Sequence, residues 1–218
     1  MYTLTLSSTR TIARYVKKIH IKLVSYENNK GILEQCPHRK FKDLAILYYV
    51  RIADRPSEGI VVIKNEHINL WNVTESELYN AAMENATKES DFELLPMADV
   101  IGHGICDSLM NNFLILSNKD RTYGASAMLT PGLLQAISRK YDKNYYIIPS
   151  SIHECILILD EEREFNLDMA MQLRELVGFV NATEVDAEDV LTENVYYFDG
   201  NSDLLIGTNS MQCKEMLA

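Results

Sequence analysis

The sequence has no apolar run that approaches the roughly 18 residues a membrane span needs, which excludes a bilayer-spanning helix. The N-terminus has no basic start followed by a long apolar core, as a secretory signal would require. With 47% apolar and 24% charged residues, the 218-residue chain has the composition of an ordinary globular protein. We therefore expect a cytoplasmic protein with no membrane contact, built as one large domain or two small ones.

Cysteine is scarce and scattered, because the four cysteines are far apart in the chain and none belongs to a Cys-x-x-Cys pair. This excludes a zinc knuckle and a thioredoxin-like redox motif, and favours reduced, mostly buried thiols. The five histidines are also scattered, without a His-x-x-x-His or His-x-x-Glu-His pattern. No Walker A or dinucleotide-binding glycine pattern occurs. We expect no metal site and no obligate cofactor.

Positive charge is concentrated at the front of the chain. Residues 1–51 hold ten Lys/Arg against three Asp/Glu, a balance of +7, whereas residues 52–218 hold eleven against twenty-eight, a balance of −17. Such a basic front can bind nucleic acid or anionic lipid. Here the basic residues are interleaved with apolar ones, which favours a structural element lying on its own acidic body. We therefore expect no nucleic-acid partner.

The N-terminal part of the chain predicts a helix, a hairpin and a second helix. Apolar residues recur at spacings of three and four over residues 12–26, which predicts an amphipathic helix. Residues 44–52 and 60–63 are aromatic and β-branched and flank a turn-rich segment, so they predict a hairpin. Thr74 and Glu77 form a capping box and predict that a helix begins there.

The C-terminal part predicts the order ββ-α-ββ-α-ββ. The expected strands are residues 113–116, 124–129, 145–148, 155–159, 195–198 and 204–206. One helix is expected to begin at Thr130, as an N-cap followed by Pro131, and another near Leu167. Because strands come in hairpins, we expect an α+β fold with largely antiparallel sheets and helices packed on one face. We expect two lobes, residues 1–90 and 91–218, with one continuous domain as the alternative.

A cluster of reactive side chains lies between the apolar runs 145–148 and 155–159. It comprises Ser150, Ser151, His153 and Glu154, which follow Pro149. In an extended segment Ser151 and His153 share a face and Glu154 points away, whereas a catalytic triad needs a carboxylate on the imidazole. We expect a turn in which a serine hydroxyl bonds local backbone, with a ligand-binding edge as the second possibility and a hydrolase site as the third.

A second polar cluster comprises Asn65, His67 and Trp71, just before the capped helix. Trp71 is the only tryptophan, and we expect it to fill the core where the helix meets the sheet. Asn65 and His67 would then tie the loop backbone. The alternative is a shallow pocket with Trp71 as a stacking platform.

Four separated motifs resemble a family known as domain of unknown function 5688, a bacterial family. They read Asn65-Glu-His-Ile-Asn-Leu-Trp71, Thr122-Tyr-Gly-Ala-Ser-Ala-Met-Leu129, Ile148-Pro-Ser-Ser-Ile-His-Glu154 and Asn181-Ala-Thr. The resemblance runs from about Tyr26 to Ile206. Members of this family have a longer N-terminal segment, and residues 1–15 do not resemble it, so the resemblance implies a truncated or shortened member. The family has no assigned activity, so the resemblance implies no catalytic residues.

We therefore expect a non-enzymatic binding or protein-interaction module, with an unknown protein or small molecule as its partner. The candidate binding residues are those of the two polar clusters: Ser150, Ser151, His153, Glu154, Asn65, His67 and Trp71. The alternatives are a low-turnover, hydrolase-like enzyme that uses His153 and a nucleic-acid-associated protein that uses the basic front.

Overall fold

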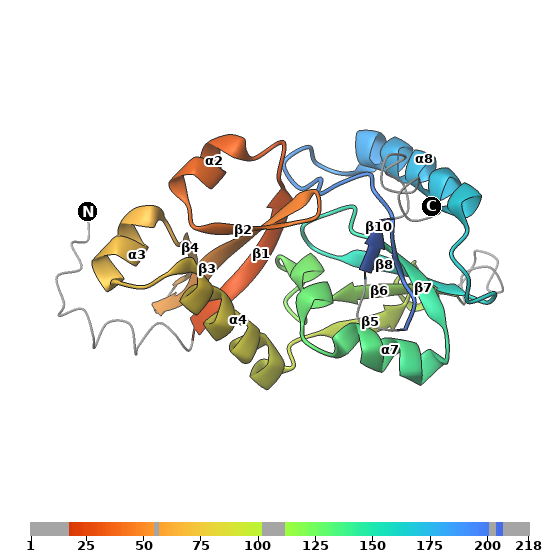
Figure 1. Cartoon of the computed structure of the whole chain (residues 1–218), viewed down its shortest axis with the longest axis horizontal. Coiled ribbons are helices and arrows are strands. Elements are labelled where there is room, and N and C mark those ends of the chain that lie inside the picture. The colour runs from red at the N-terminus through yellow and green to blue at the C-terminus, as the bar shows by residue number, and fades with distance from the viewer. Residues whose placement is uncertain (1–17, 55–56, 102–111, 201–203, 207–218) are drawn as a thin grey trace, which may run out of the picture. The chain divides into compact units, whose positions relative to one another are not determined.

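The computed structural model describes residues 18–54, 57–101, 112–200 and 204–206 (Figure 1). Contacts divide the chain into two compact units, Met1–Ser90 and Asp91–Ala218. Each unit contains an antiparallel sheet with helices beside it. The predicted α+β class with antiparallel sheets is confirmed.

The first unit contains a four-stranded sheet. Its described elements are β1 (Ile19–Ser25), α2 (Lys30–Gln35), β2 (His38–Phe41), β3 (Leu44–Asp54), β4 (Ser57–Val62), α3 (Asn65–Trp71) and α4 (Glu75–Glu89). The long strand β3 is central: β1 pairs with one edge, and β2 and β4 follow one another along the other. The predicted hairpin is confirmed, with Tyr49 opposite Val62.

Residues 19–25 form strand β1, so the predicted helix is wrong over this stretch. The rest of that prediction, up to residue 17, falls outside the described residues. Ile19 and Leu23 are four apart and fit either period, but Ile21 between them is buried too. Burial at every second residue from Ile19 to Leu23 is the pattern of a strand and not of a helix.

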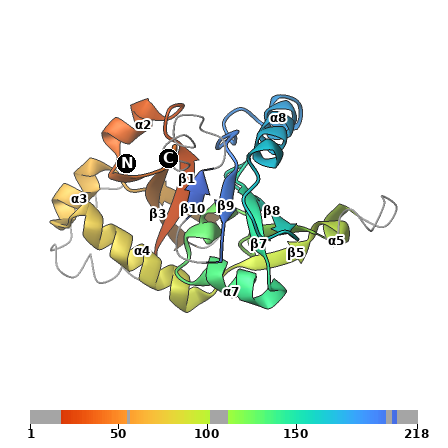
Figure 2. The same ribbon diagram turned by 45° about the vertical axis from the view of Figure 1, so that its right-hand side comes forward.

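Both faces of this sheet are covered (Figures 1 and 2). On one face Leu23 lies opposite Ile46, and this face meets α4, whose Asn85 side chain donates to the Ile19 carbonyl at 3.0 Å. On the other face Val24 and Ala45 pack with Leu33 of α2.

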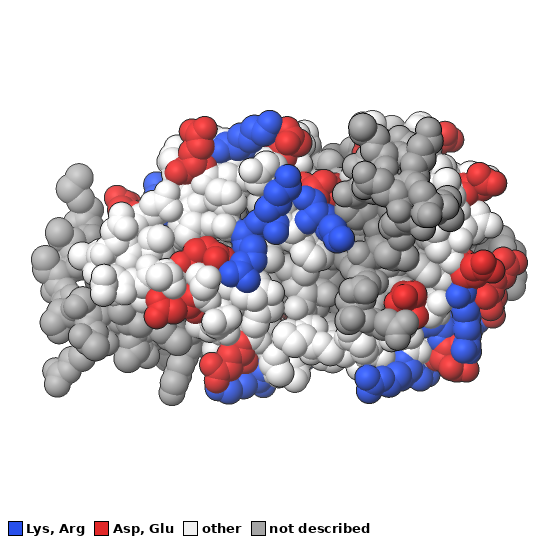
Figure 3. Space-filling model, in the orientation of Figure 1, with Lys and Arg blue, Asp and Glu red and all other residues white. Residues whose placement is uncertain are grey.

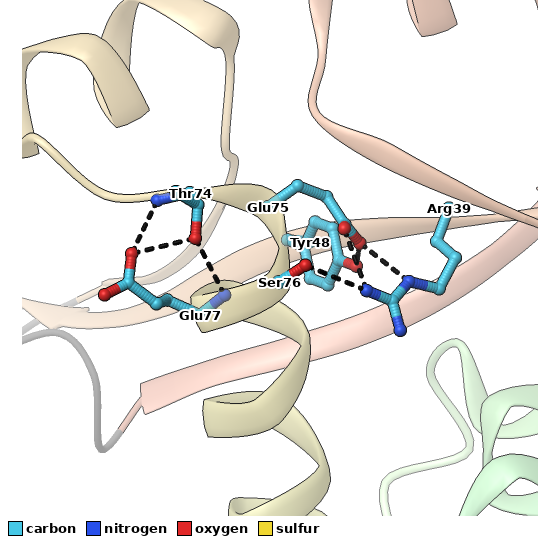
Figure 4. A network of polar contacts seen from close by, with 6 residues as sticks. All are labelled: Arg39, Tyr48, Thr74, Glu75, Ser76 and Glu77. Carbon is cyan, nitrogen blue, oxygen red and sulfur yellow. Dashed lines mark hydrogen bonds and ion pairs between the residues drawn. The ribbon is translucent and has the colours of Figure 1, made fainter.

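Helix α4 begins at the predicted capping box (Figure 4). The Glu77 backbone N–H donates to Thr74 Oγ1 at 3.3 Å, and the Thr74 N–H donates to Glu77 Oε2 at 2.8 Å. These bonds satisfy two amides that a helix start leaves without partners. Ser90, in the left-handed conformation at φ 46°, ends the helix.

The second unit contains a six-stranded antiparallel sheet in the order β10-β9-β7-β8-β6-β5. Its described elements are β5 (Glu93–Pro96), α5 (Met97–Ile101), β6 (Phe113–Ser117), the 3-10 helix η2 (Gly124–Leu129), α7 (Leu133–Tyr141), β7 (Asn144–Ile148), β8 (Cys155–Asp160), α8 (Leu167–Glu184), β9 (Tyr196–Phe198) and β10 (Leu204–Ile206). The predicted strands β7 and β8, helix α8 and closing hairpin are confirmed.

Helices α7 and α8 contact opposite faces of this sheet, whereas we expected helices on one face (Figure 2). Alternation along β7 explains this, because successive side chains point to opposite faces. Tyr146 packs with Leu173 and Val177 of α8. The neighbouring Tyr145 points the other way and donates its hydroxyl to the Leu134 carbonyl of α7 at 2.8 Å.

Two local predictions in this unit are wrong. Residues 124–129 form a 3-10 helix, not a strand, because this Gly- and Ala-rich segment follows Tyr123 in the left-handed conformation. Thr130 and Pro131 do not begin α7. The Leu133 N–H donates to the Thr130 carbonyl, and Gly132 has φ 76°, so Pro131-Gly132 makes a type II turn. Strand β5, with Pro96 at its end, was not predicted.

Candidate functional site

The 149–154 segment joins β7 to β8 and is bound by backbone contacts to the loop that follows α8. We name these contacts, between residues 150–152 and 189–191, the strap. The Ile152 N–H donates to the Asp189 carbonyl at 2.8 Å, and the Leu191 N–H donates to the Ser150 carbonyl at 3.0 Å. Between these bonds, Ser151 and Val190 form an antiparallel bridge. The predicted turn between paired strands is confirmed, and the strap brings residues about 40 positions apart into contact.

His153 lies at the centre of a polar cluster on this turn. Its Nε2 is 3.5 Å from Asp189 Oδ2, and its Nδ1 is 3.1 Å from the Arg121 carbonyl. The Tyr123 ring stacks on the imidazole, with centroids 6.1 Å apart and planes 8° apart. The side chains of His153 and Asp189 keep 39% and 28% of their surface exposed. We name these four residues the His153 cluster.

The two serines and Glu154 do not complete a catalytic arrangement. Ser151 Oγ accepts from the His153 backbone N–H at 3.1 Å, which confirms the predicted bond between a serine hydroxyl and local backbone. Ser150 contributes its carbonyl to the strap. Glu154 makes no hydrogen bond or ion pair with any described residue, and its charge adds to the burial that raises the pKa of the Cys155 thiol.

The loop that carries Arg121 and Tyr123 is held in an unusual conformation. Both residues have positive φ, 49° and 57°, a region that costs non-glycine residues free energy. The Asn118 side chain holds the loop, because it accepts from the Thr122 N–H at 3.0 Å and donates to the Thr122 carbonyl at 2.8 Å. The surrounding structure therefore fixes the face that Tyr123 presents to His153.

Chemically, the His153 cluster is a histidine–carboxylate pair without a nucleophile. In the described part of the chain, no hydroxyl or thiol bonds the imidazole of His153. A Ser-His-Asp mechanism needs a hydroxyl on one ring nitrogen and a carboxylate on the other. The imidazole edge and the Asp189 carboxylate can instead donate to and accept from a bound partner.

The second polar cluster forms the short helix α3. His67 Nδ1 accepts from the Lys64 N–H at 3.0 Å, so it ties local backbone as expected. Asn65 Nδ2 instead donates to the Glu34 carbonyl of α2 at 3.0 Å, 31 positions away in the chain. Trp71 stacks on His67 with centroids 5.6 Å apart, but it is only half-buried. The expected core tryptophan is therefore wrong, since α3 has no fully buried residue.

Sequence reasoning missed a network that joins β2, β3 and α4 (Figure 4). The Arg39 guanidinium donates to both carboxylate oxygens of Glu75, at 3.0 and 2.9 Å, and stacks over the Tyr79 ring at 3.8 Å. The Tyr48 hydroxyl also donates to Glu75. Burial and the Glu75 carboxylate raise the pKa of Tyr48. No local pattern marks these residues, because Arg39 and Glu75 are 36 positions apart.

Part of the basic front is occupied by contacts within the first unit. Figure 3 shows Lys and Arg side chains over the region that Figure 1 labels β2. Lys30 pairs with Glu27, Arg39 with Glu75, and Lys40 lies over the Tyr26 ring at 4.6 Å. Burial lowers the pKa of Lys22.

Helix α8 exposes a row of apolar side chains, which we name the α8 stripe. Its members are Met169, Leu176, Phe179 and Val180, exposed to 46%, 56%, 68% and 36%. The adjoining side of the helix, with Leu173 and Val177, is buried. The sequence predicted a helix near Leu167 but not which of its apolar residues would be exposed.

The described residues offer neither a metal site nor a membrane span. No three of their His, Cys, Asp or Glu side chains are grouped to hold a metal ion. None of the helices in the described ranges combines the length and apolar character that crossing a bilayer requires.

Residues 2–200 match the model of a family of unknown function (DUF5688), and the chain belongs to that family. The match begins well before Tyr26, where the resemblance of the motifs began. No curated protein and no solved structure matches the chain.

Three of the four motifs that carry this resemblance meet in the second unit. The Ala125 N–H donates to the Ile152 carbonyl at 3.3 Å, which joins motif 122–129 to motif 148–154. The Asn181 side chain donates to the Thr192 carbonyl at 3.3 Å, and this links α8 to the loop that carries Asp189. The motifs therefore build one structure, made of the His153 cluster, its strap and α8.

Proposed function

We propose that this chain is a non-enzymatic protein-interaction module of the cytoplasm, and that it binds its partner through the second unit. The observation that carries the proposal is the α8 stripe. Monomeric proteins rarely leave large apolar side chains exposed together unless that surface binds something. The free, buried thiols of Cys36 and Cys155 support a reducing compartment.

The His153 cluster supports the interface in this proposal. The strap at residues 150–152 holds the loop 189–192, and Asn181 of α8 bonds to that loop. The partly exposed side chains of Asp189 and His153 then offer a partner a hydrogen-bond acceptor and a hydrogen-bond donor. Polar groups of this kind supply the hydrogen bonds of a protein interface.

Affinity capture from the native host tests the proposal. Immobilised wild-type protein should enrich a specific protein, and Leu176→Asp should lose it. Leu70→Asp is the matched control, because Leu70 is 60% exposed but lies on α3 in the other unit. If no protein follows this pattern, the α8 stripe is not an interface.

A second candidate is a hydrolase-like enzyme, favoured by the contact between His153 Nε2 and Asp189 Oδ2. This reading predicts turnover of an activated ester that His153→Ala and Asp189→Asn both abolish. Equal background rates for these variants and the wild type would remove it.

A further inference from the structure

The α8 stripe continues as an uncharged row along most of the helix. Residues seven apart lie almost two turns apart, so Met169 and Leu176 share one line with Thr183. Gln172, Phe179 and Val180 fill the intervals of three and four. The row spans about 21 Å at 1.5 Å per residue. Apolar and uncharged residues at alternating intervals of three and four form the seam along which one helix packs on another.

The segment that carries this row is strongly acidic. Residues 160–193, which contain α8 and its flanks, hold eleven Asp/Glu and two Lys/Arg, a balance of −9. The whole chain carries −10. On α8 itself the acidic residues are Asp168, Glu175 and Glu184. At 100° per residue Asp168 and Glu175 lie along the same border of the seam, so the seam is neutral and this border is negative.

We propose that the α8 stripe docks a basic amphipathic helix of a partner protein, a helix whose apolar face is flanked by Lys or Arg. This inference rests on the proposed interaction function and names the chemistry of the partner. The apolar stripe packs against the apolar face of such a helix, and the acidic border with Asp168 and Glu175 pairs with a basic flank. Met169, which is 46% exposed, has a flexible side chain that adapts to partners of different shape.

The same charges disfavour two other occupants. A second copy of this chain would bring two acidic segments of −9 together, and Glu175 beside the seam would face like charge. An anionic membrane surface would be repelled for the same reason, since membrane-surface helices carry Lys and Arg on their polar face.

Three synthetic helical peptides test this proposal against the full chain by fluorescence anisotropy. The first has Leu at positions i, i+3, i+4 and i+7 with Lys on the flanks, the second replaces Lys with Glu, and the third scrambles the first. The Lys peptide should bind saturably and more weakly as salt is added. The Glu peptide should bind at least about tenfold more weakly, and the scrambled peptide should not saturate.

Variants of the chain locate the binding. Leu176→Asp and Phe179→Asp should each weaken the Lys peptide by about tenfold or more, whereas Leu70→Asp should leave its affinity unchanged. Equal affinity for the Lys and Glu peptides, or no effect of the α8 variants, would overturn the proposal. So would a dimer in sedimentation, or binding to phosphatidylglycerol vesicles, that Leu176→Asp abolishes.

The outcome separates this inference from the proposed function. If a cellular partner depends on Leu176 but the Lys peptide does not bind, the basic helix is wrong and the interaction module stands. If neither a cellular partner nor a peptide depends on Leu176, both are wrong.

Discussion

Gly124 marks the tightest point beside the His153 cluster. A Cβ atom placed on it would lie 2.5 Å from the His153 carbonyl oxygen and 2.6 Å from the Asn118 backbone nitrogen. Both are backbone atoms, so neither can turn away as a side chain would. Only glycine fits where motif 122–129 crosses motif 148–154.

Gly124→Ala should therefore lower the free energy of unfolding by about 3 kcal/mol, through overpacking. Gly31→Ala is the matched control, because a Cβ on Gly31 meets nothing within 4 Å. It lies in helix α2, where alanine is favoured over glycine, so it should be neutral or stabilising by up to about 0.5 kcal/mol. Urea melts measure both; a Gly124→Ala protein as stable as the wild type would contradict the close approach.

Thr74 is the second residue whose role can be isolated. Thr74→Ala removes the hydroxyl that accepts from the Glu77 N–H, and should cost about 1 kcal/mol of stability. Asn80→Ala, at an exposed position within the same helix, serves as the control in chemical denaturation. Equal midpoints for the two variants would show that the cap contributes nothing.

Among the elements, those defined by local patterns could be predicted from the sequence. The capping box at Thr74, the hairpin of β3 and β4, and the turn at Ser151 depend on residues close in the chain. Strand β1 could not be predicted, because Ile19 and Leu23 fit both the helical and the strand period.

The candidate site was predictable only in part. Ser151 and His153 were found from their neighbours. Asp189 lies 36 positions from His153 and is brought to it by the backbone contacts between segments 150–152 and 189–191, which no local pattern predicts. Trp71 was expected in the core and is only half-buried. This could not be predicted, because hydrophobicity alone does not show which face of a short helix is covered.

The two faces of α8 should respond differently to substitution. Leu173→Ala removes a buried side chain and should cost about 2–4 kcal/mol. Leu176→Asp changes a side chain that is 56% exposed and should alter stability by no more than about 0.5 kcal/mol. Thermal or urea melts compare them, and a large loss for Leu176→Asp would mean that the stripe is covered within the folded protein.

At the scale of the whole molecule, buried tyrosines in both units predict lability to alkali. Burial is the main cause that raises the pKa of Tyr48, Tyr145 and Tyr197, and the hydrogen bond to Asp160 adds to it at Tyr197. An unfolded tyrosine has a pKa of about 10. The folded state therefore holds these protons more tightly, and its advantage is present below that pH and is lost as pH rises above it.

The free energy of unfolding should therefore fall steadily above about pH 10. Urea melts at increasing pH measure this, and tyrosinate absorbance should show that some of the twelve tyrosines ionise only on unfolding. Reversible titration of all twelve near pH 10 with the fold intact would contradict the burial of these hydroxyls.

The most direct test of the central claim, that the α8 stripe is a binding surface for a basic helix, is methyl NMR of the nine methionines. Met169 is exposed on the stripe, whereas Met83 and Met128 are buried in other elements. Titration with the Lys-flanked amphipathic peptide should shift the Met169 methyl signal and leave those of Met83 and Met128 in place. A Met169 signal that does not move, while the peptide binds elsewhere or not at all, would contradict the account.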